Sequence, residues 1–381
     1  MEQTMGSTEK NLVSWMQEEA LPLWADRGVD RERGGFVEEL NQDGSPSQVA
    51  FKRVRVQGRQ LFSFSIAAIL GWNKEAASIA DHGYEFMKKY CRGKDGVWVK
   101  KVSRDGSILD PQLDLYDTAF IVLGLITYYR LTKNSEALLL VEETLRMVQT
   151  QLSTDQPSGY RQMLSEKDLL RQNPNMHWFE CMLFCYEATQ DSRFLDEVAK
   201  FYSRMEDSVI DGKTGALREI FDNQWKPVKE EGKILVEPGH HYEWAWLLNR
   251  SSNKIAVDPN LITLIAQFAD KYGVNAQTGL VYDQVSDQGE LTQATHRLWV
   301  QTEALKAWLV RPDVEETARV NRIQQIEQNL LKYYFTREPK GSWGDRLDAD
   351  GRCHPGQVPA SSLYHIMVCV TELAAWRSEK A

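Results

Sequence analysis

The sequence lacks any long apolar run and any dense cluster of basic residues, and each absence excludes a class of protein. No stretch of the 381 residues approaches the roughly 20 consecutive apolar residues of a membrane-spanning helix. The formal net charge is −9, whereas a surface that binds nucleic acid or an anionic membrane needs clustered lysine and arginine. We therefore expect neither a nucleic acid nor a membrane as a partner.

Cysteine is scarce as well, and its distribution argues against disulfides. The cysteines are odd in number and scattered: Cys91, Cys181, Cys185, Cys353 and Cys369. Residues 1–10 are polar and lack the apolar segment of a secretory signal peptide. Free thiols suit a reducing compartment, so we expect a cytoplasmic protein. Cys181 and Cys185 lie one helical turn apart, but with no third ligand nearby this spacing favours core packing over metal binding.

Glycine-rich phosphate loops are missing too. Neither Gly-x-x-x-x-Gly-Lys-Ser/Thr nor a Gly-x-Gly-x-x-Gly motif before a helix occurs in the chain. We therefore expect no nucleotide cofactor.

What the sequence does contain is a short glycine-led segment that recurs six times. Each copy continues from its glycine into strand-like residues, and several then reach a turn such as Asp-Gly. The copies begin at Gly35, Gly96, Gly159, Gly215, Gly279 and Gly341, which are 61, 63, 56, 64 and 62 residues apart. Apolar stretches with helical spacing lie between the copies, for example over 120–129 and 135–152.

Each unit of about 60 residues therefore predicts two helices and a small hairpin. An open solenoid of such units needs polar capping repeats at its ends, yet the first and last units are as apolar as the middle ones. We predict a closed ring, an all-α (α/α)6 barrel with six inner and six outer helices and short β-hairpins in the connecting loops. No linker rich in Pro, Gly or Ser interrupts the period, so we expect a single catalytic domain over residues 1–381.

One register position of the repeat carries chemically varied side chains. Near the start of the first helix of each unit stand Arg59, Asp117, His177, His240, Trp299 and His365. Equivalent positions of a closed ring converge on its axis, and a purely structural position would carry similar apolar residues. We therefore predict an active site at the centre of the ring. The histidines outside this register, which we interpret as surface or supporting residues, are His82, His241, His296 and His354.

Further polar residues flank two of these histidines. Asn173 lies four residues before His177 and Glu180 three after it, while Glu243 follows His240 by three residues. Residues three apart share one face of a helix. These neighbours are therefore candidates for the same site.

The helix predicted around His240 has consequences for the protonation of that residue. Pro238-Gly239 indicate a helix start, and the positive end of the helix dipole favours a neutral imidazole. With an ordinary pKa of about 6.5, such a group is suited to take a proton near neutral pH. Three histidines and Glu243 could also hold zinc, but zinc ligands usually come at short spacings, so we predict no metal.

Several pieces of the sequence resemble the N-acylglucosamine 2-epimerase family. They are Gln57–Ser65, Asn173–Glu180, Pro238–Trp244, Arg297–Glu303 and Tyr364-His365. Glu243-Trp244, Gly34-Gly35-Phe36 and Leu115–Phe120 are similar to the mannose isomerase branch of that family. The resemblance implies an (α/α)6 barrel that interconverts free aldoses and ketoses without a metal or other cofactor.

The resemblance also implies roles for the residues. His240 and His365 would be the catalytic acid/base pair, and Arg59 would bind and polarise the sugar's oxygens. Asn173, His177 and Glu243 would position hydroxyls or tune the histidines, and Trp299 would form a wall of the site. We add Glu180 and Asp117 to the substrate-binding set because of their places in the repeat.

The function that we expect is interconversion of D-mannose and D-fructose through a cis-enediolate. One histidine would remove the C2 proton of the open-chain sugar, while Arg59 would stabilise the negative charge that develops on oxygen. Return of the proton to C1 gives the ketose. The expected partner is a free monosaccharide, and the expected assembly is a monomer or a homodimer.

Other functions remain open at this point. Return of the proton to the opposite face of C2 would make the chain a 2-epimerase acting on mannose/glucose, N-acylglucosamine/N-acylmannosamine or cellobiose. A glycoside hydrolase on the same barrel would need two carboxylates, such as Asp117 with Glu180 or Glu243. A non-catalytic sugar-binding protein is the third class.

Overall fold

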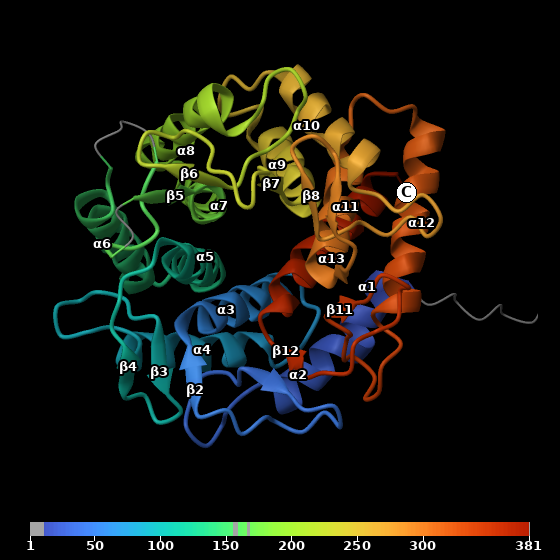
Figure 1. Cartoon of the computed structure of the whole chain (residues 1–381). Coiled ribbons are helices and arrows are strands. Elements are labelled where there is room, and N and C mark those ends of the chain that lie inside the picture. Colours follow the sequence, from blue (N-terminus) through green and yellow to red (C-terminus); the bar gives the residue numbers. More distant parts are fainter. Residues whose placement is uncertain (1–10, 155–158, 166–167, 381) are drawn as a thin grey trace, which may run out of the picture.

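The computed structural model describes residues 11–154, 159–165 and 168–380. Within these residues an inner ring of six helices is built from α3 (Val54–Ile69), α5 (Leu115–Thr132), α7 (Gln172–Thr189), α9 (Pro238–Ser251), α11 (Leu298–Val310) and α13 (Ser362–Lys380). Each inner helix contacts the next, and α13 contacts α3, so the ring closes (Figure 1). The predicted (α/α)6 barrel is confirmed.

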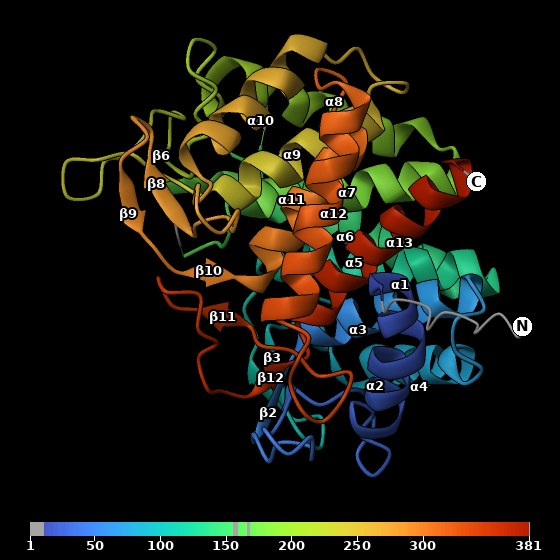
Figure 2. The same ribbon diagram turned by 90° about the vertical axis from the view of Figure 1, so that its right-hand side faces the viewer.

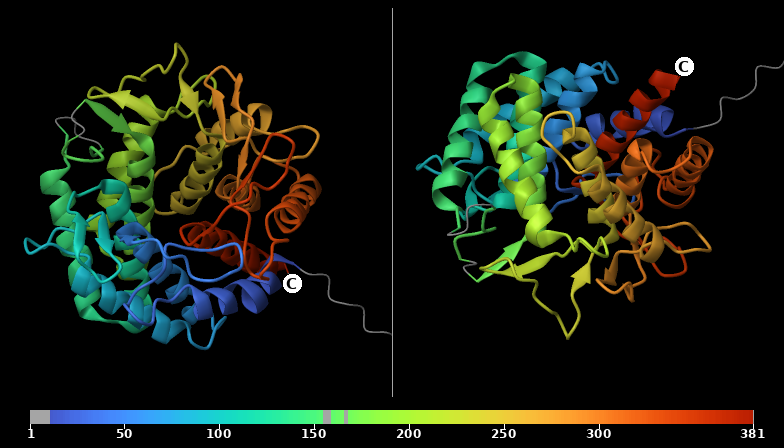
Figure 3. Two further views of the ribbon diagram at one scale, coloured as in Figure 1. Left: turned by 60° about the horizontal axis from the view of Figure 1, so that its bottom comes forward. Right: turned by 90° about the horizontal axis from the view of Figure 1, so that it is seen from above.

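The outer helices cover the inner ring. They are α4 (Ala76–Tyr90), α6 (Ser135–Gln151), α8 (Ser192–Arg204), α10 (Pro259–Tyr272) and α12 (Glu316–Tyr333), and each packs on the inner helix that precedes it (Figure 3). The π-helical turn η2 (Met205–Val209) extends α8.

The sixth outer position is filled from the other end of the chain. It is taken by α1 (Leu12–Trp15), the π-helical turn η1 (Met16–Ala20) and α2 (Leu21–Arg27), and α1 contacts α13 (Figure 2). Glu327 of α12 accepts a hydrogen bond from the Leu12 backbone N–H and pairs with Arg377 of α13. The first and last parts of the described chain therefore close the barrel together.

Short strands lie at the end of the barrel where the inner helices begin (Figure 2). They form the sheets β2 (Phe51–Arg53)–β3 (Lys101–Ser103)–β4 (Ile108–Asp110), β5 (Leu169–Arg171)–β6 (Ile220–Asp222), β7 (Leu235–Val236)–β8 (Gln284–Ser286)–β9 (Leu291–Gln293), β10 (His296–Arg297)–β11 (Arg346–Leu347) and β1 (Glu39–Leu40)–β12 (Val358–Pro359). The pairs β3–β4 and β8–β9 are hairpins of the predicted kind. The other pairs join the strand before an inner helix to a loop of a neighbouring repeat, so they fasten the repeats to one another.

Glycine is required where the repeats begin and where two inner helices meet. All six glycines that begin the repeats have positive φ, between 67° at Gly35 and 99° at Gly159, a conformation that side chains disfavour. At the contact of α3 with α5, a Cβ on Gly58 would lie 2.4 Å from the Phe120 carbonyl oxygen. This close approach sets Arg59 of α3 beside the start of α5.

The interior of the barrel is apolar around a polar centre. One large cluster of buried hydrophobic residues extends from Leu12 to Leu373. Of the described helices, none is both long enough and apolar enough to cross a membrane. Buried polar and charged side chains gather mainly on the inner helices α3, α7, α9, α11 and α13.

Candidate active site

A cavity of about 270 Å³ opens at the N-terminal ends of the inner helices. All six inner helices and the loops before them contribute to its wall, which consists of Arg59, Tyr116, Asn173, His177, Glu237, His240, Glu243, Arg297, Trp299, Asp345, Ser361, Ser362 and His365. The inner helices thus bring residues from all six repeats to one polar pocket.

Most, but not all, of the predicted site residues line this cavity. Those that do are Arg59, Asn173, His177, His240, Glu243, Trp299 and His365. Glu180 lies beneath it and is fully buried. Asp117 is not among the lining residues; its Oδ1 accepts a hydrogen bond from Arg55 at 2.8 Å, and its neighbour Tyr116 lines the cavity instead.

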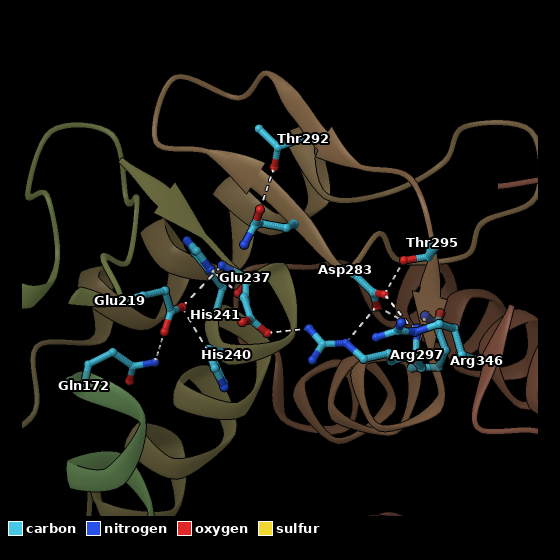
Figure 4. A network of polar contacts seen from close by, with 12 residues as sticks. Gln172, Glu219, Glu237, His240, His241, Asp283, Thr292, Thr295, Arg297 and Arg346 are labelled. Atoms are coloured by element: carbon cyan, nitrogen blue, oxygen red, sulfur yellow. Dashed lines mark hydrogen bonds and ion pairs between the residues drawn. The ribbon is translucent and has the colours of Figure 1, made fainter. Parts of the chain in front are cut away.

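His240 is held by a carboxylate from the loop that precedes its own helix. Its Nδ1 lies 2.9 Å from Oε1 of Glu219, whose Oε2 accepts a hydrogen bond from Gln172 at 2.7 Å (Figure 4). Burial lowers the pKa of His240, but the charge and hydrogen bond of Glu219, assisted by the charge of Glu237, outweigh burial and raise it to about 9. His240 is therefore an imidazolium near neutral pH. Our prediction of a neutral His240 is wrong, because nearby carboxylates outweigh the helix dipole.

His365 has the opposite protonation. Its Nδ1 lies 2.8 Å from Oε1 of Glu303, and the other Glu303 oxygen lies 2.5 Å from Nζ of Lys306. Burial, together with the positive charges of Arg59 and Lys306, holds the pKa of His365 well below its ordinary value. Burial raises the pKa of Glu303 to about 6, so Glu303 is ionised near neutral pH and can only accept a hydrogen bond. We therefore assign the imidazole proton to Nδ1, which leaves a lone pair on Nε2.

His177 is oriented by a third buried carboxylate. Its Nδ1 lies 3.1 Å from Oε2 of Glu180, and the hydroxyl of Tyr364 donates to the other Glu180 oxygen. Burial lowers the pKa of His177 below its ordinary value. All three histidines of the cavity therefore direct Nδ1 at a glutamate, an arrangement that fixes the orientation of each ring.

Glu243 differs from the other buried glutamates. Neither of its carboxyl oxygens has a hydrogen-bond partner among the described residues. Burial raises the pKa of Glu243 well above the ordinary value. Burial therefore favours the protonated form of Glu243, which can donate a hydrogen bond to a sugar hydroxyl.

Arg59 is a buried cation. Within the part of the chain that the structure describes, its hydrogen bonds all go to uncharged groups. It donates to the Tyr116 hydroxyl at 2.8 Å and to the Ser361 carbonyl oxygen at 3.3 Å, and its guanidinium lies 3.8 Å from the centre of the Phe120 ring. Only 5% of Arg59 is exposed. Its positive charge is thus available to a negative charge that forms inside the cavity.

Trp299 lies close to both expected acid/base residues. Its ring centre is 5.0 Å from that of His240 and 5.7 Å from that of His365. The two imidazoles therefore border a common aromatic wall, against which the apolar face of a sugar ring can pack.

Two groups of buried ligand-type atoms lie beneath the cavity. The atoms of His177, Glu180 and Glu243, and those of Glu243, Glu303 and His365, lie within 4.8 Å of one another in each group, close enough to share a metal ion. The ammonium of Lys306 already supplies a positive charge to Glu303. We treat this cluster as an ion-pair network.

Glu219, Glu303 and Lys306 had no role in the sequence analysis. Glu303 could have been found, because Glu180 and Glu243 each follow the register residue by three positions and Glu303 follows Trp299 by four. Glu219 stands in a loop 21 residues before His240, and neither a motif nor a period connects the two. Of the histidines outside the register, His241 and His296 are fully buried supporting residues, whereas His354 is exposed.

The comparisons with known proteins agree on one family. A family model described as N-acylglucosamine 2-epimerase (GlcNAc 2-epimerase) matches residues 34–369. Mannose-6-phosphate isomerase of Rhizobium meliloti (strain 1021) is 30% identical over 373 residues, which are 95% of this chain and 95% of that protein.

Solved structures support the fold. Cellobiose 2-epimerase from Bacillus thermoamylovorans B4167 has a TM-score of 0.86 at 22% identity, covering 96% of this chain and 98% of its own. A D-mannose isomerase has a TM-score of 0.85 at 20% identity, covering 98% of this chain and 100% of its own. A family 76 mannosidase from Bacteroides thetaiotaomicron VPI-5482 is more distant, with a TM-score of 0.69 at 13% identity over 97% of this chain and 100% of its own.

Proposed function

We propose that this chain, which belongs to the N-acylglucosamine 2-epimerase family, interconverts D-mannose and D-fructose without a metal. The chain is an enzyme, and its relatives are sugar isomerases and epimerases. The observation that carries the finer proposal is one cavity bordered by a protonated His240, an unprotonated Nε2 of His365 and the buried charge of Arg59.

These groups divide the chemistry between them. When the ring opens, His240 donates a proton as an imidazolium to the ring oxygen and takes up the proton that the anomeric hydroxyl loses, so it is protonated again afterwards. His365 then takes the C2 proton of the open-chain aldose with Nε2, and a cis-enediolate forms. Arg59 stabilises the negative oxygen at that stage. The proton of the C2 hydroxyl passes to the C1 oxygen, and the same His365 returns its proton to C1, which yields the ketose.

The same two histidines can also serve an epimerase, because epimerisation returns a proton to the opposite face of C2 from a donor such as an imidazolium. Glu219 holds a proton on His240, and the Trp299 ring lies close to both histidines. Isomerisation is supported by the 30% identity to a mannose-6-phosphate isomerase, compared with 25% to the cellobiose 2-epimerase of Bacteroides fragilis. We therefore place 2-epimerisation second.

The carboxylates that the sequence offered for a glycoside hydrolase do not meet in the cavity. Of the three carboxylates considered from the sequence, Asp117 is bound to Arg55 and Glu180 lies under His177. Only Glu243 of the three lines the cavity, and burial raises its pKa. A retaining or inverting hydrolase needs an acid and an ionised partner on the two sides of the bond.

A substrate panel tests the proposed function. A neighbouring cavity of about 360 Å³ shares Tyr116, Asn173, Glu237 and His240 with the first, so the panel includes sugars larger than a free hexose. Purified protein is incubated with mannose, mannose 6-phosphate and cellobiose, and the products are separated by chromatography. Fructose from mannose is the expected result. Glucose from mannose would make the chain an epimerase, and no change in mannose would contradict the proposal.

Replacing Glu219 with glutamine is expected to move the alkaline limb of the pH–rate profile to lower pH. Burial lowers the pKa of His240, and the Glu219 carboxylate overcomes burial to raise it to about 9. The wild-type rate should therefore be retained below about pH 9 and lost as the pH rises through that value. In Glu219→Gln the effect of burial dominates, and His240 loses its proton at lower pH.

The measurement is kcat/KM for mannose as a function of pH. Glu290→Gln, which removes an exposed glutamate, is the matched control and should retain the wild-type profile. The free energy of unfolding depends on pH in the same direction. The Glu219–His240 pair stabilises the protein fully below the ordinary histidine pKa of 6.5, and its contribution disappears by about pH 9. An unchanged alkaline limb in Glu219→Gln would contradict the assignment of His240 as the acid.

A further inference from the structure

Lys306 of α11 is a cation that is completely buried and lies outside the lining of the cavity. Its Nζ lies 2.5 Å from Glu303 Oε2 and 3.9 Å from the centre of the Trp246 ring. Burying a lysine without a strong compensating interaction is costly, so its position next to one carboxylate needs an explanation. The other oxygen of that carboxylate lies 2.8 Å from Nδ1 of His365. Lys306, Glu303 and His365 thus form a continuous line from the interior to the cavity.

We propose that Lys306 is a positioning residue that keeps Glu303 ionised and so keeps the proton of His365 on Nδ1. The proposal rests on the proposed function only in that His365 acts as the base. It adds a residue that does not touch the sugar and that determines which nitrogen of His365 can accept a proton.

The two states of Glu303 have opposite effects on His365. An ionised carboxylate only accepts, so it holds the proton on Nδ1 and leaves the Nε2 lone pair facing the cavity. A protonated carboxyl can donate to Nδ1, and the imidazole proton then moves to Nε2. In that state His365 has no lone pair toward the sugar and cannot take the C2 proton.

The charge of Lys306 decides between these states. Burial raises the pKa of Glu303 to about 6 even though Lys306 acts to lower it. Without the ammonium, the Glu303 carboxyl would bind a proton near neutral pH. Packing around the side chain does not supply this effect, since it depends on charge.

The other groups that face this line do not replace Lys306. Glu180 of α7 and Glu243 of α9 are acids whose electrostatic influence also reaches Lys306, and Glu180 disfavours ionisation of Glu303. The remaining neighbours with titratable or charged groups are His177 of α7, Arg59 of α3, and Tyr364 and Cys369 of α13. Arg59 acts on His365 from the cavity, and its recorded hydrogen bonds go to Tyr116 and Ser361 rather than to Glu303.

The test replaces Lys306 with methionine, which keeps an unbranched chain against Trp246 and removes the charge. We expect kcat for mannose near neutral pH to fall about tenfold to a hundredfold, a loss on the scale of a general base. The acid limb of kcat should move to higher pH, and activity should partly return as the pH rises toward the alkaline limb, because Glu303 then loses its proton. KM should change little. A structural defect would not be repaired by raising the pH. Lys332→Met, at an exposed position of α12, is the matched control.

A second readout does not depend on turnover. Nitrogen NMR of protein labelled in histidine reports which ring nitrogen of His365 carries the proton, with His365→Asn identifying the signal. We expect Nδ1–H in the wild type and Nε2–H in Lys306→Met near neutral pH. If the methionine variant fails to fold, Lys306→Gln tests the charge alone, since its amide can still donate to Glu303.

Each outcome is decisive. Nε2–H in the wild type, or an unchanged tautomer and pH profile in a folded Lys306 variant, overturns the proposal. A tautomer that changes as expected in a protein that leaves mannose unconverted supports the role of Lys306 and contradicts only the proposed function.

Discussion

Replacing His365 with asparagine is expected to lower kcat for mannose by at least about a hundredfold, the usual scale for loss of a general base. His365 is the imidazole of the cavity whose Nδ1 is bound by Glu303 and whose Nε2 keeps a lone pair near neutral pH. The asparagine amide can still donate to Glu303, so the substitution removes the proton acceptor and leaves the buried carboxylate with a partner. KM should change much less than kcat, because the proton transfer belongs to the transition state.

Initial rates of fructose formation measure this effect. His354→Asn is the matched control, because His354 is exposed and does not line the cavity. Circular dichroism and a melting curve establish that both variants fold. If His365→Asn retains kcat within about tenfold of the wild type, His365 is not the base that removes the C2 proton.

Replacing Arg59 with methionine is expected to lower kcat/KM for mannose by about a hundredfold to a thousandfold, as for loss of a donor to a developing oxyanion. Arg59 is 5% exposed, and among the described residues its recorded hydrogen bonds go only to the Tyr116 hydroxyl and the Ser361 carbonyl. A buried charge without an ionic partner costs stability, so its removal should not lower the melting temperature. Lost activity with retained stability is the expected combination.

Binding of a hydroxamate analogue of the enediolate separates charge stabilisation from binding of the neutral sugar. Arg59→Met should weaken the analogue by about as much as it lowers kcat/KM and should weaken the neutral ketose less. Arg352→Met, at an exposed arginine, should change neither quantity. Equal weakening of analogue and ketose would show that Arg59 binds the sugar uniformly and does not stabilise the intermediate.

The fold could be predicted because its signal repeats. Six glycines at nearly equal spacing predicted six units, and all six take the positive φ that only glycine adopts readily. The predicted hairpins were found around Gly106 and Gly289, between β3 and β4 and between β8 and β9. Pairing of strands between repeats has no comparable sequence signal, since it depends on how the ring closes.

The sequence predicted which faces of the inner helices line the cavity, but it did not predict every lining residue. The register brought Arg59, His177, His240, Trp299 and His365 to one cavity. At α5 the register was one residue out, because Tyr116 faces the cavity and Asp117 turns to Arg55. One position along a helix turns a side chain by about 100°, which is enough to remove it from the wall.

The protonation states could not be predicted from the register. His240 was expected to be neutral from the helix dipole alone, yet Glu219, 21 residues earlier, lies 2.9 Å from its Nδ1. The charge of a full carboxylate at that distance exceeds that of the helix end. Lys306 was likewise unrecognised, because a lysine in an apolar helical stretch gives no sign that its ammonium will be buried against Glu303.

The most direct test of the account is a proton NMR time course of the purified protein with mannose in heavy water and a chelator. The account predicts fructose that carries deuterium at the exchanged carbon, because the C2 proton passes through His365 to C1 with some exchange against solvent. Unchanged activity in the chelator is part of the same prediction. Mannose that yields no fructose and takes up no deuterium at C2 would contradict the account.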